Sequence, residues 1–172
     1  TTTLLAAYGI AASLDVAVAA PQPSPRPLEV LIRVVSDPTF GPVLLFGPSG
    51  PAALLLDHCA AALPPLNLVL AREALAHTPV QRLLPSRADP ASMKLLDAVA
   101  LLLVKVAQIV VDLGEVIALE LNPVLVAADR VMVGAARIQV VATPGPAQQR
   151  LAIRPYPREL EETLTLPDGA TL

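Results

Sequence analysis

The sequence predicts an α+β domain, a mainly antiparallel sheet with covering helices on one face. Two apolar segments, residues 28–35 and 41–47, have the composition of buried strands, and Asp-Pro and Gly between them predict a turn. A long helical segment occupies residues 90–113, and two further strand-like segments follow at 116–126 and 131–140. Because the strands come in pairs joined by short turns, antiparallel pairing is favoured over a parallel sheet.

The composition supports one compact domain with a tail. The chain has 172 residues, of which 54% are hydrophobic and 16% are charged, so a sizeable core can form and global disorder is excluded. Aromatic residues make up only 2%, which means that Leu, Val and Ala must build this core. The formal net charge of −3 gives no electrostatic basis for binding nucleic acid or an anionic membrane.

Helical periodicity is clearest at residues 90–113. Asp89 followed by Pro90 is an N-cap signal with proline in the first turn, and Gly114 marks the end of the helix. The apolar residues of the segment recur at helical spacing and predict one buried stripe: Leu95, Leu96, Val99, Leu102, Leu103, Val106, Val110 and Leu113.

Three charged residues, Asp97, Lys105 and Asp112, interrupt this apolar segment. Charges in the middle of a membrane helix are costly, so the segment is predicted to be the buried helix of a soluble protein and not a membrane span. The lone Cys59 rules out an internal disulfide and a Cys-based zinc site. These features predict a cytoplasmic protein with no membrane partner.

Two polar residues in the strand at 116–126 could form a binding site. Side chains alternate along a strand, so Glu120 and Asn122 share one face, and counting through a four-residue loop places Asn122 opposite Ala135. Directly paired residues have Cβ atoms roughly 5 Å apart. Mg²⁺ prefers oxygen ligands, commonly one or two carboxylates with substrate phosphates. Glu120 and Asn122 supply half of such a site; a solvated strand face is the favoured interpretation of this pair, ahead of a weak cation site and of a working ATP site.

The motif "ELNPV" around Glu120 and Asn122 resembles the end of the ATP-grasp domain in ADP-forming acyl-CoA (acetyl- and succinyl-CoA) synthetases. The family has magnesium ligands at these two places and a third, an aspartate, where "AARI" has Ala135. "LLAAYGI" is similar to the family's opening helix, and "SDPTFGPVLLFG" to an Arg-Asp-Pro-x-Phe-Gly-Pro stretch. Ser36 and Ala62 stand where the family has arginines. The resemblance implies Mg²⁺ and ATP as cofactors.

The same resemblance has a large gap. Where the family carries a nucleotide-clamping subdomain, this chain has the proline-rich residues 21–27, so we expect residues 1–142 to form a truncated ATP-grasp-like domain. Residues 143–172 are rich in proline and charge and are predicted to be a linker. The tail is similar to the connector that precedes the acetyltransferase domain in bacterial protein lysine acetyltransferases.

These observations lead to two functional hypotheses. The first is a non-catalytic, degenerate structural or regulatory domain of a multidomain protein N-acetyltransferase, with the CoA-binding and N-acetyltransferase domains of the same chain as partners. The second is the ATP-binding part of an ADP-forming acetate or acyl-CoA ligase, similar to succinyl-CoA synthetase, that needs a partner chain. A third alternative is a pure dimerisation domain that forms a homo-oligomer. No catalytic residue is assigned, and activity is left open.

Overall fold

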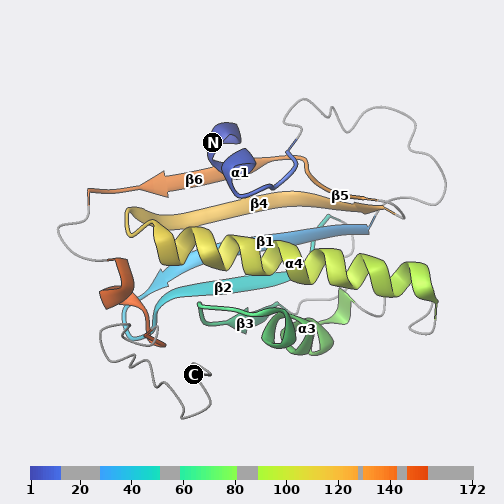
Figure 1. Ribbon diagram of the computed structural model, residues 1–172, viewed down its shortest axis with the longest axis horizontal. Helices are drawn as coiled ribbons and strands as arrows, with labels where there is room; N and C mark the ends of the chain where they lie inside the picture. Colours follow the sequence, from blue (N-terminus) through green and yellow to red (C-terminus); the bar gives the residue numbers. More distant parts are fainter. Residues whose placement is uncertain (13–27, 51–58, 81–88, 128–129, 143–146, 155–172) are drawn as a thin grey trace, which may run out of the picture.

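The structure is a computed structural model, and it describes residues 1–12, 28–50, 59–80, 89–127, 130–142 and 147–154. Within these residues six strands form one sheet with the order β3-β2-β1-β4-β5, and β6 pairs with β4 beyond the end of β5. Figure 1 shows α4 lying across this sheet with α1 and α3 beside it. The predicted α+β architecture is confirmed. The element bounds are α1 Thr2–Ala7, β1 Leu28–Asp37, β2 Gly41–Pro48, β3 Ala60–Ala62, α3 Leu68–Ala76, α4 Pro90–Asp112, β4 Val116–Ala127, β5 Arg130–Val133, β6 Ala136–Val140 and the 3-10 helix η2 Ala147–Arg150.

The predicted hairpin at the start of the sheet is confirmed. β1 pairs antiparallel with β2, and the pairing closes at Asp37 opposite Gly41. The Asp37 carboxylate accepts backbone N–H bonds from Phe40 at 2.9 Å and Thr39 at 2.8 Å. These two bonds stabilise the ionised carboxylate and lower the pKa of Asp37. The turn residues that the sequence signalled therefore close the hairpin as expected.

Helix α4 covers the sheet and follows most of the predicted pattern. Of the predicted stripe, the buried residues are Val99, Leu102, Leu103, Val106 and Val110, and the partly buried ones are Leu95, Leu96 and Leu113. Asp89 is its N-cap, with side-chain oxygens that accept from the backbone of Ala91 at 3.3 Å and of Ser92 at 3.1 Å. The buried core consists of residues from this helix, α1, α3 and the facing side of the sheet, among them Leu5, Leu75, Leu103, Val106, Ile32, Phe46 and Leu119. No helix within the described residues is long and apolar enough to cross a membrane.

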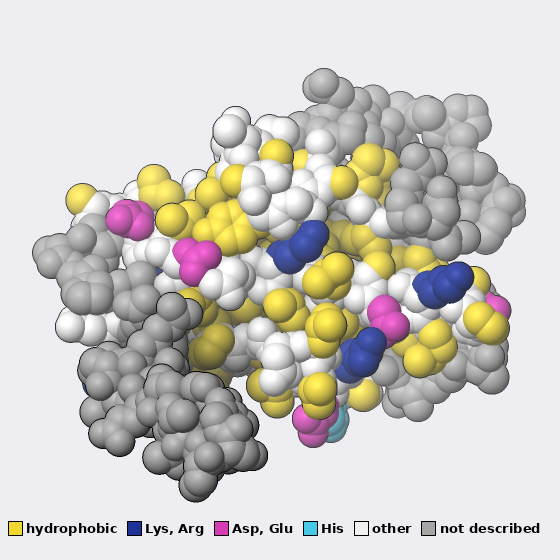
Figure 2. All heavy atoms as spheres, in the orientation of Figure 1, with side chains coloured by type: hydrophobic (Ala, Val, Ile, Leu, Met, Phe, Trp, Pro, Cys, Tyr) yellow, Lys and Arg dark blue, Asp and Glu magenta, His cyan; other side chains and the backbone are white. Residues whose placement is uncertain are grey.

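The polar stripe of α4 fastens the two smaller helices. Arg72 of α3 binds the Asp97 carboxylate at 2.8 Å, and the Tyr8 hydroxyl next to α1 donates to Asp112 at 2.9 Å. Burial and the nearby Asp112 carboxylate raise the pKa of Tyr8. Figure 2 shows that hydrophobic side chains otherwise dominate this helical face. The charged residues that interrupt the apolar sequence of α4 therefore bind the neighbouring helices.

The strand predicted at 131–140 is divided into β5 and β6. β4 has one extra residue relative to β1, because the register shifts between Val30 and Ile32, and this bulge at Asn122–Pro123 lies where β5 ends. Gly134 faces Pro123 across the break, and its N–H donates to the Pro123 carbonyl at 2.9 Å. A local distortion in one strand thus interrupts its partner.

Part of the predicted linker packs against the domain. Arg150 of η2 donates from Nη1 to the Val116 carbonyl at 2.6 Å, and from Nη2 to the carbonyls of Val110 at 2.7 Å and Leu113 at 2.9 Å. Leu151 is buried, so this turn belongs to the folded body. The proline-rich residues 21–27 and the remainder of the tail lie outside the described residues, and the domain boundary at 142 stays a prediction.

Candidate functional site

The sheet has a second face, opposite α4, on which polar side chains gather. In β1 the alternate residues Val30, Ile32 and Val34 are buried on the helical side, so Glu29 and Arg33 lie on the opposite face. In β4, Leu119 and Leu121 are buried, which places Glu120 and Asn122 on that same opposite face. The predicted alternation of these β4 residues is confirmed. We call this side of the sheet the open face.

Asn122 lies at the bulge of β4. After the bulge the alternation is reversed, because Val124 and Val126 point into the core although Leu119 and Leu121 did so before it. The Asn122 N–H donates to the carbonyl of Ala135 at 3.0 Å. The predicted position of Asn122 opposite Ala135 is therefore confirmed. Bulges commonly redirect a side chain at a binding site.

Glu120 lies between two arginines. Its direct cross-strand neighbours are Arg33 on β1 and Arg137 on β6. Glu120 Oε2 accepts from Arg33 Nε at 3.0 Å and forms an ion pair with Arg33 Nη2 at 2.8 Å. The side chain of Arg33 is 44% exposed and that of Glu120 is 34% exposed, so the ion pair contributes only about 0–1 kcal/mol to stability. We call Arg33, Glu120 and Arg137 the charged row.

Ser49 joins the site from the end of β2. Its hydroxyl donates to Asn122 Oδ1 at 2.5 Å, and its side chain is 7% exposed. Its N–H donates to the Glu29 carbonyl at 2.9 Å. Gly50 follows with a φ of +60°, and a side chain there would overlap the Glu29 carboxylate. Ser49 and Gly50 thus hold Asn122 and Glu29 at one end of the open face.

Sequence reasoning missed three members of this site. Arg33 and Ser49 were not among the residues that the sequence indicated, because their partners are distant in the sequence. The position of Arg137 could have been predicted from the sequence, because the register that places Asn122 opposite Ala135 also places Glu120 opposite Arg137. The open face therefore carries more positive charge than the sequence predicted.

Ala62 and Ser36, which stand where the family has arginines, lie away from Glu120 and Asn122. Ala62 pairs with the buried Leu44 on the helical side of the sheet, where it packs against the core. Ser36 lies at the end of β1 next to the turn, paired with Pro42. Of the three positions at which the chain lacks a family side chain, only Ala135 lies beside Asn122.

The donor set suits a hard cation in part. Glu120 and Asn122 offer one carboxylate and one amide oxygen on the same face, which are ligand types that Mg²⁺ accepts. Arg33 binds one of the two carboxylate oxygens of Glu120, and Ser49 donates to the single side-chain oxygen of Asn122, which keeps one lone pair. The described residues contain no group of three or more His, Cys, Asp or Glu that could enclose a metal. Magnesium binding by Glu120 and Asn122 stays a prediction, in which phosphate oxygens and water would complete the shell.

Known proteins are similar to this chain in sequence. The sequence profile of the ATP-grasp domain matches residues 11–140. An acetate–CoA ligase (ADP-forming) I from Archaeoglobus fulgidus is 32% identical over 100 residues, which is 57% of this chain and 14% of the ligase.

Solved structures are similar over the same region. A Pyrococcus horikoshii protein aligns with a TM-score of 0.59 and 27% identity, over 69% of this chain and 50% of that one. The dinucleotide-forming acetyl-coenzyme A synthetase 1 of Korarchaeum cryptofilum, determined with coenzyme A and Mg-AMPPCP, aligns with a TM-score of 0.58 and 25% identity, over 69% of this chain and 55% of that one. The present chain spans less than two thirds of each of these relatives.

Proposed function

Because its residues 11–140 match the family profile, the chain belongs to the ATP-grasp domain family, and we propose that it is the nucleotide-facing half of an ADP-forming acyl-CoA ligase. Its relation to ADP-forming acetyl-CoA synthetases supports this assignment over a purely structural role. The other half of the nucleotide pocket would come from further parts of the protein or from a partner chain.

The charged row is the observation that carries the proposal. Guanidinium groups bind phosphate oxygens through paired hydrogen bonds, and two of them flank Glu120 on adjacent strands. Among the described residues Arg137 forms no ion pair, so its charge is available for a ligand. The Arg33–Glu120 pair is partly exposed and weak, so a polyphosphate can compete for Arg33.

The neighbouring groups suit the remainder of a nucleotide. Leu31 and Leu45 are half-buried on the open face and offer an apolar surface to a nucleobase. Glu120 and Asn122 would hold Mg²⁺, which on binding supplies positive charge to the phosphate oxygens. The Ser49 hydroxyl fixes the orientation of the Asn122 amide, and Arg33 and Arg137 place positive charge beside it. These residues bind and orient the nucleotide.

A second candidate is favoured by Ala135. Where the family has an aspartate beside Asn122, this chain has a methyl group, and the Ala135 carbonyl is occupied by the Asn122 N–H. A lost ligand suits a non-catalytic domain that holds the CoA-binding and acetyltransferase domains of a larger N-acetyltransferase. In that case nucleotide binding would be absent, and the charged row would have only a structural role.

Isothermal titration with MgADP and MgATP separates the two candidates. The first expects saturable binding that weakens by about tenfold in Arg137→Met, as for loss of one charge-assisted contact. Arg72→Met is the matched control, because Arg72 lies on the helical side and its loss should leave the affinity unchanged. Ala135→Asp should increase the dependence on magnesium. Absence of binding by both the parent chain and Ala135→Asp, also when the part that completes the pocket is added, would support the structural candidate instead.

A further inference from the structure

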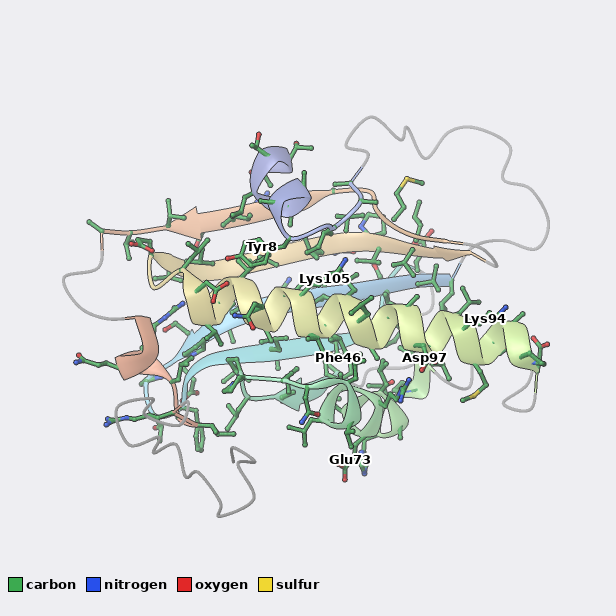
Figure 3. All side chains as sticks on the ribbon, viewed as in Figure 1. Tyr8, Phe46, Glu73, Lys94, Asp97 and Lys105 are labelled. Carbon is green, nitrogen blue, oxygen red and sulfur yellow. The ribbon has the colours of Figure 1, made fainter. Side chains whose placement is uncertain are left out.

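A cavity lies on the helical side of the sheet, away from the charged row. It has a volume of about 280 Å³, opens to solvent on one side, and is bordered by the turn after α1, by α4 and by β5. Ile10, Leu102 and Val133 form buried apolar walls, and Leu101 is 45% exposed at the edge. Figure 3 shows Lys105 on the side of α4 that faces α1, at this cavity. The cavity thus combines apolar walls with one cationic group.

Lys105 has no carboxylate partner within the described part of the chain. Its ammonium donates to the Gly9 carbonyl at 2.5 Å, which leaves hydrogens for other acceptors. The Asp112 carboxylate, about two helical turns further along α4, accepts on both oxygens, from Tyr8 at 2.9 Å and from Gln108 at 2.6 Å. An ammonium next to an apolar cavity, without a compensating anion, offers an electrostatic site for an acidic group.

Hydrogen bonds hold the walls in place. The Val133 N–H donates to the Ala11 carbonyl at 3.0 Å, and Ala12 bridges to Val133, so the turn after α1 is tied to β5. Gly9 has a φ of +64°, and a Cβ there would approach the Lys105 ammonium to 3.2 Å. Lys105 joins the same turn to α4. The cavity is therefore formed by three elements that contact one another directly.

We propose that this cavity binds a short aliphatic carboxylate, with the carboxylate on Lys105 and the hydrocarbon chain against Ile10, Leu102 and Val133. Its volume of about 280 Å³ corresponds to about nine groups of the size of water, at about 30 Å³ each. Hexanoate, with its six carbons and two oxygens, matches this size. The site lies on the other side of the sheet from Glu120 and Asn122, and it does not depend on nucleotide binding.

Titration of the 172-residue chain with hexanoate, followed by ¹H–¹⁵N correlation spectra and calorimetry, tests this proposal. We expect saturable shifts at Gly9, Ala98 and Val131, which line the cavity. Lys105→Met should weaken binding about tenfold, as for loss of one charge-assisted hydrogen bond, whereas Lys105→Arg should retain it. Lys94→Met is the control, because Lys94 is exposed at the other end of α4 (Figure 3).

Two further arms keep the test decisive if Lys105→Met does not fold. Ala98→Met should fill the cavity and abolish binding with Lys105 intact. Hexylamine, which reverses the charge, and acetate, which lacks the chain, should both bind far more weakly than hexanoate. The proposal is overturned if hexanoate does not saturate, if hexylamine binds equally well, or if Ala98→Met leaves the affinity unchanged.

Discussion

Arg150 is the residue whose removal best tests how the C-terminal segment joins the domain. Its guanidinium donates three hydrogen bonds to the carbonyls of Val110, Leu113 and Val116, at 2.6 to 2.9 Å. Two of these carbonyls belong to the C-terminal end of α4, where a cation also opposes the negative end of the helix dipole. Burial lowers the pKa of Arg150, but the guanidinium remains charged at neutral pH.

Arg150→Met keeps the hydrophobic part of the side chain and removes these bonds. Water regains access to the carbonyls, so we take roughly 1 kcal/mol for each bond, which predicts a loss of about 3 kcal/mol in the free energy of unfolding. Urea denaturation followed by circular dichroism measures this change. The slope of the unfolding free energy against urea concentration is compared between variants.

Arg154→Met is the matched control. Arg154 is exposed, so its loss should change the free energy of unfolding by less than about 0.5 kcal/mol. If Arg150→Met behaved like Arg154→Met, the bonds from η2 would not stabilise the fold. The whole segment from residue 143 would then be a linker, as its composition predicts.

Three further predictions concern the core, a helix cap and a glycine. Leu103→Ala should lower the free energy of unfolding by about 3 kcal/mol in urea titrations, because Leu103 is fully buried, whereas Leu101→Ala on the exposed side of α4 should cost far less. Bonds from the first turn of α4 lower the pKa of Asp89, so its contribution to stability is present above pH 3.8 and is lost as the pH falls through the lowered value. Asp89→Asn, which retains a cap but not the charge, should flatten this acid dependence in melting curves recorded from neutral to acidic pH. Gly41→Ala should destabilise the chain, because φ is +69° and the new Cβ would overlap the Arg150 backbone carbonyl. Arg150→Met keeps this carbonyl, so the two losses are coupled only if both changes displace η2, and strict additivity would contradict that coupling.

Local patterns predicted the elements of this fold well. The Asp89 cap and helical spacing located α4 to within a residue at each end, because capping and periodicity are set by neighbouring residues. The β1–β2 turn and the register between Asn122 and Ala135 were also predictable, since the paired residues are joined by short connections.

The candidate site was predicted only in part, because its contacts are not local. Arg33 and Glu120 are 87 residues apart, and Ser49 and Asn122 are 73 apart, so no spacing rule relates them. Their contact depends on β1 lying between β2 and β4, and this strand order is decided by burial of the helical face of the whole sheet. The division of β5 from β6 was missed for a related reason, because the bulge becomes visible only when β4 is paired with β1.

The extra residue at Asn122–Pro123 keeps both halves of β4 in the core. If the same sequence paired with β1 without the bulge, simple alternation would turn Val124 and Val126 outward, while Leu119 and Leu121 stayed in the core. Half of the strand would then present its apolar side to the open face. Deletion of one of these two residues would instead give a regular strand with the same four residues in the core, so the extra residue determines the local position of Asn122 and not the composition of the core.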